Sequence, residues 1–503
     1  MKYISTRGGG SPCTAAEAIK AGLAPDGGLF VPEATPELGG NMPEELAPLG
    51  YQERAARILT PFLTDYTAAE IKASVLAAYG GGKFDHAAVA PLQTFGDGFS
   101  VLELWHGPTS AFKDMALQLL PHLLSQALAK TREAREVVIL VATSGDTGKA
   151  ALEGFRDVKQ TRIVVFFPDE GVSEVQRLQM VTQEGGNVVV VAVNGNFDDA
   201  QTGVKSIFND PGFSAELGDR GFLLSSANSI NWGRLVPQIV YYYSAYADLV
   251  KGGRIRSGQE VNFVVPTGNF GNILAGYYAK QMGLPVGRLI CAANKNNVLT
   301  DFLRTGVYDR RREFFKTMSP SMDILISSNL ERLLYYATGG DTAQVSAWMS
   351  ELNASGAYRV AGTPLARIQE TFWSGWADES TTAKTIRAVY EHCRYLLDPH
   401  TAVAWSVAEE YRRETSDRTP LVVVSTASPF KFNHSVLAAL SGPGATRGKG
   451  EFDILRELSA ATGRTVPKAL ATLEHKPVRH RALTDKAAMA DAVRDVLHIV
   501  KDN

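Results

Sequence analysis

Short apolar runs alternate with amphipathic segments along most of the chain, from about residue 101 to residue 425. The runs are continuous and rich in Val and Ile, which is typical of parallel strands buried on both faces. We predict six strands, at Val137–Ala142, Ile163–Phe167, Val188–Val193, Val261–Val265, Arg288–Ala293 and Leu421–Ser425. Segments of helical period lie between them, at Lys149–Phe155, Ser173–Gln183, Asp198–Phe208, Ile230–Leu249 and Asn272–Met282. This alternation predicts the α/β class, with open sheets that helices cover on both faces.

The two ends of the chain have a different pattern. Near the N-terminus we expect amphipathic helices at Thr14–Ala21, Tyr51–Leu63 and Ala68–Tyr79, and a short edge strand after the turn Asp26-Gly27-Gly28. The last segment, from Glu451 to Asn503, is charged and mostly of helical period. We therefore predict three parts: an N-terminal domain over residues 1–95, a large α/β domain over 96–440, and a mostly helical extension over 441–503.

The composition is that of a globular protein, and it argues against several kinds of partner. The 503 residues carry a formal net charge of −2, with 45% hydrophobic and 21% charged residues, so neither a nucleic acid nor a membrane surface is favoured. No apolar run approaches the ~18–20 residues of a membrane helix, and the first residues lack the apolar core of a signal peptide. The three cysteines are too few and too scattered for a disulfide framework or a metal site. We expect a cytoplasmic protein without a bound metal.

One lysine lies between a rigid turn and a strongly helical run. In His106-Gly-Pro-Thr-Ser-Ala-Phe-Lys-Asp114 the Gly-Pro pair sets a bend, and we predict a helix over Met115–Ala134. Lys113 would then lie among the unpaired N–H groups at the positive end of that helix. An ammonium is disfavoured there, whereas a neutral amine or an imine is not. The alternative is an ordinary lysine that extends to water.

Three of the predicted strands end in turns of unusual composition, and ligands of open α/β sheets bind beyond the carboxyl ends of strands. The first of these turns is Thr143-Ser-Gly-Asp-Thr-Gly148. Its hydroxyls and the amides of a helix start suit a carboxylate, although such a turn can also merely cap a helix. Asp146 opposes anion binding unless it faces a donor or a cation instead.

The second and third turns suit a phosphate and a ring nitrogen. In Pro266-Thr-Gly-Asn-Phe-Gly-Asn272, Gly268 and Gly271 let the backbone approach a ligand closely, and successive amides can surround a phosphate. This turn matches neither a Walker A loop nor a dinucleotide fingerprint. In Thr426-Ala-Ser-Pro-Phe-Lys-Phe432, the hydroxyl of Thr426 could meet a neutral ring nitrogen or cap a helix.

An imine lysine, a phosphate site, a carboxylate turn and a hydroxyl for a ring nitrogen are what pyridoxal phosphate and an amino-acid substrate need. In the same order, the blocks that contain them resemble those of the threonine synthases. Three further blocks share the resemblance: Ser319-Pro-Ser-Met-Asp-Ile324, Ser327-Ser-Asn-Leu-Glu-Arg332 and Asp398-Pro-His-Thr-Ala402. The resemblance begins at Tyr3-Ile-Ser-Thr-Arg-Gly8 and extends to about Lys431, and it fits the long form of the family with an N-terminal domain.

The resemblance implies the tryptophan-synthase-β-like fold of type II pyridoxal-phosphate enzymes, with two lobes of open sheet. It implies a carbon–oxygen lyase of threonine biosynthesis, which converts O-phospho-L-homoserine and water to L-threonine and phosphate through an aldimine. Lys113 would be the Schiff-base lysine. The other cofactor contacts it implies are Gly268, Asn269, Phe270, Asn272, Thr426 and, near the ring hydroxyl, Asp146. The substrate carboxylate would be bound by Thr143, Ser144 and Thr147.

The departing phosphate needs cations or amides to hold it. Within Ser226–Arg234, the residues that fit this need are Ser229, Asn231 and Arg234, although Arg234 could equally be a structural arginine of a helix. We interpret His400, which follows Asp398-Pro399 at a helix start, as hydrogen-bonded scaffold rather than an acid–base group. We expect a monomer or a homodimer.

Two alternatives remain open at the level of the sequence. The first is another type II lyase with the same cofactor, such as threonine dehydratase or cysteine synthase. The second is a non-catalytic, phosphate-binding relative that keeps the fold and has lost the lysine chemistry. The presence of every expected cofactor residue argues against a non-catalytic relative. A site for the substrate phosphate would distinguish a threonine synthase from the other type II lyases.

Overall fold

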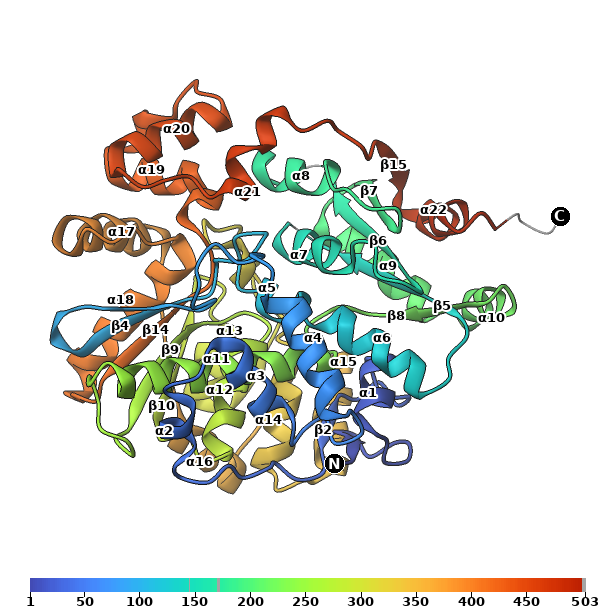
Figure 1. The fold of residues 1–503 in the computed structure, drawn as a ribbon, viewed down its shortest axis with the longest axis horizontal. Helices are drawn as coiled ribbons and strands as arrows, with labels where there is room; N and C mark the ends of the chain where they lie inside the picture. Colours follow the sequence, from blue (N-terminus) through green and yellow to red (C-terminus); the bar gives the residue numbers. More distant parts are fainter. Residues whose placement is uncertain (144, 170–171, 500–503) are drawn as a thin grey trace.

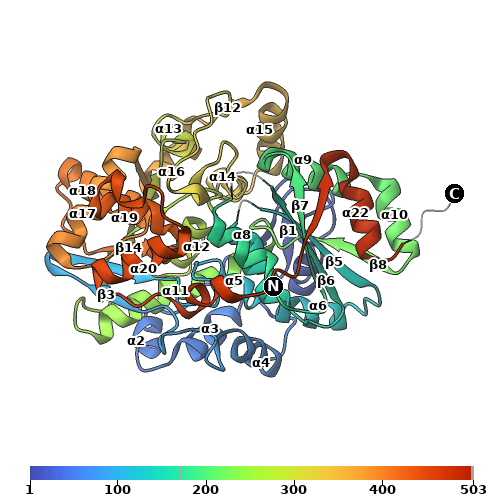
Figure 2. The ribbon, with the colours of Figure 1, turned by 90° about the horizontal axis from the view of Figure 1, so that it is seen from above.

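The computed structural model describes residues 1–143, 145–169 and 172–499. It contains two large, mostly parallel sheets, whose lobes lie side by side in Figures 1 and 2. The six-stranded sheet has the order β13-β10-β9-β14-β4-β3, and all of its pairs are parallel except β3 with β4. Its strands are β3 (Leu92–Thr94), β4 (Phe99–Glu103), β9 (Val261–Pro266), β10 (Val286–Ala293), β13 (Phe372–Trp376) and β14 (Leu421–Ser425).

The second lobe is built on a five-stranded parallel sheet of order β15-β7-β6-β5-β8. Its strands are β5 (Glu136–Ala142), β6 (Thr161–Pro168), β7 (Val188–Asn194), β8 (Phe222–Ser225) and β15 (Ala482–Asp485). The six predicted strands are all present, with bounds close to those expected. Because β5 to β8 are inserted between β4 and β9 of the first sheet, the chain crosses from one lobe to the other and back.

Apolar residues of one strand alternate between two separate cores, as burial on both faces requires. In β5, Val137, Ile139 and Val141 face one core, whereas Val138 and Leu140 face another. The helices of the two lobes are α5 (Asp114–Leu117), α6 (Leu120–Lys130), α7 (Asp146–Phe155), α8 (Glu174–Val181), α9 (Phe197–Phe208), α10 (Pro211–Asp219), α11 (Trp232–Lys251), α12 (Gly271–Gln281), α13 (Val298–Thr305), α14 (Leu330–Ala337), α15 (Thr342–Ser355), α16 (Gly362–Thr371), α17 (Glu379–Cys393), α18 (Pro399–Thr415) and α19 (Asn433–Ser441).

The N-terminal segment packs against the lobes rather than apart from them. It contains the antiparallel pair β1 (Tyr3–Ser5) and β2 (Phe30–Pro32), with α1 (Ala15–Ala21), α2 (Met42–Leu46), α3 (Tyr51–Leu59) and α4 (Ala68–Tyr79). Trp232 at the start of α11 contacts the rings of Tyr3 and Phe62 from this segment and of Tyr278 from α12. The boundaries predicted at residues 95 and 440 stay proposals. Within the described residues, no helix is long and apolar enough to cross a membrane.

The predicted helix over Met115–Ala134 is wrong in one respect, because it is broken into α5 and α6. Pro121 lies in the first turn of α6, and a proline has no N–H and clashes with the carbonyl four residues before it. That carbonyl belongs to Leu117, where α5 ends. Gly154 of α7 packs directly on the Leu117 carbonyl, since a Cβ added to Gly154 would lie 2.0 Å from this oxygen. The short helix that follows Lys113 is thus positioned by a glycine of the neighbouring helix.

The C-terminal segment is less helical than predicted. It contains α20 (Glu451–Thr462), α21 (Lys468–Ala471) and α22 (Met489–Val496), but Ala482–Asp485 forms β15 and pairs with β7. In Figure 1 this segment passes from α19 and α20 above the first lobe to β15 and α22 on the second. β15 is short, lies at the sheet edge and exposes Leu483, so it has no apolar run that a sequence pattern could reveal.

We predict that Gly154→Ala destabilises the protein by about 1–3 kcal/mol, because the new methyl group would overlap the Leu117 carbonyl. Gly218→Ala is the matched control, since Gly218 also lies in a helix and its added Cβ would meet nothing within 4 Å. That control is expected to be neutral or stabilising by up to about 1 kcal/mol. Urea-unfolding midpoints of the two variants measure the difference, and equal midpoints would refute the packing argument.

Candidate active site

The predicted turns converge where the carboxyl ends of the two sheets face each other. Lys431, beyond β14, forms an ion pair of 2.7 Å with Asp146 at the start of α7. The backbone N–H of Phe112 donates to the carbonyl of Thr426 at 2.8 Å, which joins the lysine turn to the same β14 loop. The structure therefore brings together three of the strand ends and loops that the sequence singled out.

Lys113 is the N-cap residue of α5 and is only partly exposed. Its Nζ donates to the hydroxyl of Ser321 at 3.3 Å and lies 5.4 Å from the ring centre of Phe112. Burial lowers the pKa of Lys113 to about 8, and the positive charges of Lys431 and Arg234 act in the same direction. A substantial fraction of this amine is therefore neutral near physiological pH.

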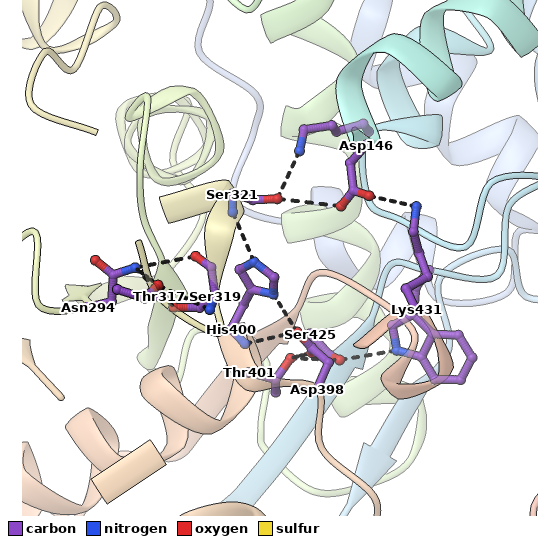
Figure 3. A network of polar contacts seen from close by, with 12 residues as sticks. Asp146, Asn294, Thr317, Ser319, Ser321, Asp398, His400, Thr401, Ser425 and Lys431 are labelled. Atoms are coloured by element: carbon purple, nitrogen blue, oxygen red, sulfur yellow. Dashed lines mark hydrogen bonds and ion pairs between the residues drawn. The ribbon is translucent and has the colours of Figure 1, made fainter. Parts of the chain in front are cut away.

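Asp146 faces a cation. A carboxylate in this turn would oppose anion binding unless a donor or a cation were its partner, and the structure provides both. Its Oδ1 accepts from Lys431 and, at 3.0 Å, from Nε2 of Gln176, while Ser321 donates to its Oδ2 at 3.4 Å. Burial opposes ionisation of this carboxyl, but Lys431 and Lys113 outweigh it and hold the pKa of Asp146 below its ordinary value. Asp146 is thus an ionised carboxylate inside the protein (Figure 3).

The turn from Pro266 to Asn272 has the geometry of an anion cradle. Phe270 adopts a left-handed conformation (φ 63°), after which α12 begins. The carbonyl of Gly268 accepts from the hydroxyl of Ser327, and that of Asn269 accepts from the backbone N–H and the side chain of Asn329. These contacts turn the carbonyl oxygens away, so the amides at the start of α12 can face a ligand.

Asn272, in the first turn of α12 beside this cradle, has an unpaired donor. Its Oδ1 accepts from the hydroxyls of Tyr241 and Tyr242 at 2.7 and 2.8 Å, whereas its buried Nδ2 has no hydrogen-bond partner. An unpaired buried N–H costs about 1–3 kcal/mol. An anion in the cradle would satisfy it. Asn269, by contrast, has an exposed side chain and contributes mainly backbone.

The turn at residues 143–148 is held by Thr143. Its hydroxyl accepts from the backbone N–H groups of Gly145 and Gly148, both at 3.0 Å. Ser144 lies outside the described residues, and Thr147 is half-buried. The predicted carboxylate-binding role of Thr143, Ser144 and Thr147 stays a prediction.

The first turn of α11 carries a buried cation, Arg234, whose guanidinium is only partly paired within the described residues. Arg234 is 3% exposed, donates through one nitrogen to the carbonyl of Ala227, and leaves its Nε without a partner. Burial lowers the pKa of Arg234 to about 10. Asn231 behaves differently, because its Oδ1 accepts from Gly233 and its Nδ2 donates to the carbonyls of Ile19 and Ser226. These bonds disfavour the predicted contact between Asn231 and substrate, and Ser229, which is half-buried, stays a prediction.

Thr426 and His400 are both buried. Within the described residues the carbonyl of Thr426 accepts from the N–H of Phe112 while its hydroxyl has no hydrogen-bond partner, so the predicted contact of Thr426 with a ring nitrogen stays a prediction. His400 is hydrogen-bonded scaffold: its Nδ1 pairs with Asp398 at 2.7 Å, and its Nε2 accepts from the backbone N–H of Ser321 at 3.2 Å (Figure 3).

Sequence reasoning missed Lys431 and Ser321. Lys431 follows Phe430 as Lys113 follows Phe112, and this repeated Phe-Lys pair after a turn was the one available signal. Ser321 lies in a short 3₁₀ turn far along the chain, where no pattern points to the lysine. Within the described residues, no group of three or more His, Cys, Asp or Glu side chains could hold a metal ion.

Comparisons with known proteins identify three segments. Residues 2–79 match the family model described as threonine synthase N terminus, residues 92–358 match pyridoxal-phosphate dependent enzyme, and residues 401–496 match threonine synthase, C-terminal. The threonine synthase of Pseudomonas aeruginosa is 44% identical over 437 residues, which cover 87% of this chain and 90% of that protein.

Two further comparisons concern length and structure. The threonine synthase-like 1 protein of Homo sapiens is 42% identical over 434 residues, which cover 84% of this chain but only 58% of that protein. The chain thus spans little more than half the length of these relatives. The crystal structure of a threonine synthase from Brucella melitensis, described as PLP bound, matches with a TM-score of 0.87 and 40% identity over 99% of each chain.

We predict that Lys113 reacts with an amine-selective acylating reagent with a midpoint near pH 8 in the ligand-free protein. The neutral amine is the nucleophile, so a lowered pKa moves the reactive range down from the ~10.4 of an ordinary lysine. Competitive labelling at a series of pH values, read by peptide mass spectrometry, gives this midpoint alongside those of exposed lysines.

A variant tests the same electrostatic argument through a shift in the opposite direction. Lys431→Met removes a positive charge that lowers the pKa of Lys113, so its midpoint should move upward. A Lys113 midpoint equal to that of the exposed lysines in the unaltered protein would contradict the electrostatic argument.

Proposed function

The chain belongs to the threonine synthase family, and from that premise we propose that it is a pyridoxal-phosphate-dependent threonine synthase. Its reaction would convert O-phospho-L-homoserine and water to L-threonine and phosphate. The observation that carries the proposal is a lysine of lowered pKa in a site with two buried, unpaired donors, Asn272 Nδ2 and Arg234 Nε. Two phosphate groups, one on the cofactor and one on the substrate, would satisfy one donor each.

The residues fit the cofactor. Gly268, Asn269, Phe270 and Asn272 would hold its phosphate, since the cradle presents amides and one orphaned side-chain N–H. Within the described residues the hydroxyl of Thr426 has no hydrogen-bond partner and could meet the ring nitrogen, and the lowered pKa of Lys113 makes its neutral amine, which covalent attachment requires, more abundant than that of an ordinary lysine. Asp146 would lie near the ring hydroxyl, with Lys431 as its fixed counter-ion.

Lys113 would serve as the base once the substrate amine has replaced it on the cofactor. When bound, the cofactor withdraws electrons from the substrate and so acidifies the proton on Cα. Lys113 would take that proton, and a second proton would leave Cβ as phosphate departs from Cγ. A proton would then add at Cγ, which becomes the methyl group of threonine, before water adds at Cβ and a proton returns to Cα. A pKa of about 8 suits a group that must both accept and return a proton near neutral pH.

Arg234 would hold the departing phosphate, with Ser229 beside it, and Thr143, Ser144 and Thr147 would bind the substrate carboxylate. A buried guanidinium with a free Nε can donate to a phosphate oxygen without first breaking an ion pair. We further propose that the protein acts in the cytoplasm, as a monomer or a homodimer. Its three cysteines are free, which suits a reducing compartment.

The function is tested with purified protein loaded with pyridoxal phosphate. O-phosphohomoserine should yield inorganic phosphate and threonine in equal amounts, and Lys113→Ala should lower kcat by at least about 100-fold, because the base is lost. Formation of 2-oxobutyrate from threonine as the dominant reaction would favour a dehydratase instead. Protein that never acquires the absorbance of the lysine-linked cofactor would favour a non-catalytic relative.

We predict that Asn272→Asp weakens the binding of pyridoxal phosphate at least about tenfold, because an acceptor and a negative charge replace the free N–H. The substituted carboxylate can still accept from Tyr241 and Tyr242, so the fold is expected to persist. Pyridoxal, which lacks the phosphate, is the matched control ligand and should bind the variant and the unaltered protein alike. Equal losses for both ligands would mean that Asn272 acts on the fold and not on the phosphate.

A further inference from the structure

A short strap of the chain lies across the phosphate cradle and touches the lysine. This strap, Ser319 to Asp323, contains the 3₁₀ turn η2 (Pro320–Met322). A Cβ added to Gly268 would lie 2.8 Å from the carbonyl oxygen of Ser321, so the strap rests directly on the cradle. None of the roles proposed above uses it.

The hydroxyl of Ser321 connects Lys113 with Asp146. Lys113 Nζ donates to it at 3.3 Å, and it donates onward to Asp146 Oδ2 at 3.4 Å. Because Asp146 is ionised and cannot donate, the hydroxyl hydrogen points to Asp146 and the oxygen lone pair faces Lys113. One N–H of the lysine is thereby fixed toward Ser321. The lone pair of the neutral Lys113 amine must then point away from Ser321. This limits the directions in which the amine can attack a carbonyl carbon or accept a proton.

The position of Ser321 is in turn fixed by a histidine. His400 Nε2 accepts the backbone N–H of Ser321 at 3.2 Å, so this nitrogen carries no hydrogen. The hydrogen of the ring is on Nδ1, which points to Asp398 Oδ1 at 2.7 Å. Asp398 is 1% exposed, and its other oxygen accepts from Thr401. This pair sets the tautomer and the angle of the ring (Figure 3).

A second set of hydrogen bonds holds both ends of the strap, on either side of Ser321. Asn294 Nδ2 donates to the hydroxyl of Ser319 at 3.0 Å and to Asp323 Oδ1 at 2.7 Å. Thr317 also donates to Asp323, at 2.7 Å. Figure 3 shows Asn294, Thr317 and Ser319 on one side of Ser321 and His400 directly beneath it. The strap is therefore held on both sides, and the serine is its point of contact with the lysine.

We propose that Ser321 is a catalytic residue, whose hydroxyl orients the amine of Lys113, and that His400 and Asp398 are positioning residues that act through Ser321. The inference deepens the proposed function and rests on it for the reaction that Lys113 performs. No proton need leave Ser321, since its hydroxyl donates to Asp146 and accepts from Lys113 throughout.

The test uses four variants of the full chain: Ser321→Ala, His400→Leu, the double variant and His400→Gln. The first readout is the rate at which pyridoxal phosphate becomes linked to Lys113, followed by absorbance near ~410–420 nm. The second is the division of any loss between kcat and KM for O-phosphohomoserine. Urea-unfolding midpoints check folding, and Ser355→Ala, at an exposed serine, is the matched control.

Ser321→Ala is expected to slow linkage and lower kcat about tenfold each, with KM within twofold, because one hydrogen bond to the reacting nitrogen is lost. His400→Leu should give a similar loss, and the double variant should be no worse than Ser321→Ala. His400→Gln offers a carbonyl oxygen in place of Nε2 and should restore most of the rate.

Linkage and turnover at unaltered rates in Ser321→Ala would overturn the proposal. So would fully additive losses in the double variant, since His400 would then act independently of Ser321. The proposed function can fail separately: if the unaltered protein links pyridoxal phosphate but releases no phosphate from O-phosphohomoserine, the linkage rates still decide the role of Ser321.

Discussion

The site depends on an imbalance of buried charge. Lys113, Lys431 and Arg234 bring positive charge together, while Asp146 is the ionised carboxylate that contacts Lys431 directly and Lys113 through Ser321. Within the described residues, the partner of the Arg234 side chain is a carbonyl, that of Ala227, and not a carboxylate. Removing an uncompensated charge from water costs several kcal/mol. A ligand-free protein must bear that cost, and anionic ligands remove it. Phosphate-bearing molecules at about a thousand times their Kd would return ~4 kcal/mol of stability.

The scaffold keeps this imbalance in place by tying the anion-binding loops to one another. Arg332, at the start of α14, donates to Asn329, whose side chain holds the cradle carbonyl of Asn269. The same guanidinium donates to the carbonyl of Ile230, in the segment that leads to Arg234, and to Phe30 of the N-terminal sheet. Its neighbour Glu331 pairs with Arg7 at 2.8 Å. The N-terminal segment thus supports both places where a phosphate would bind, which explains why it shares its core with the lobes.

The sequence predicts local features of this site and not its long-range contacts. Strand ends and turns follow from apolar runs and glycines, so the cradle, the lysine turn and the lone carboxylate Asp146 could all be found. Lys431 and Ser321 could not be assigned. Their partners in the site, Asp146 and Lys113, lie 285 and 208 residues away in the sequence. Ser321 also lies in a 3₁₀ turn that no sequence pattern marks. Asn231 shows how long-range contacts can also disfavour a prediction: its side-chain oxygen caps α11 and its amide nitrogen donates to two carbonyls, so its contact with substrate stays a prediction that these bonds disfavour. The break before α6 could have been predicted from the geometry of Pro121. The continuous apolar period of the surrounding residues favoured a single helix instead.

The electrostatic balance also links ligand binding to the strength of the base. Burial, Lys431 and Arg234 lower the pKa of Lys113, whereas Asp146 and, to a smaller extent, Asp114 raise it. A phosphate beside Arg234 would offset part of the positive field, since the interaction of charges in a poorly solvated site falls slowly with distance. The amine would then be a stronger base with substrate bound than without it. On the proposed function, departure of the phosphate would restore the field and favour release of the proton that Lys113 holds. A site with fully paired charges would lack this coupling, so on the proposed function the excess positive charge that costs stability would also favour the direction of proton transfer.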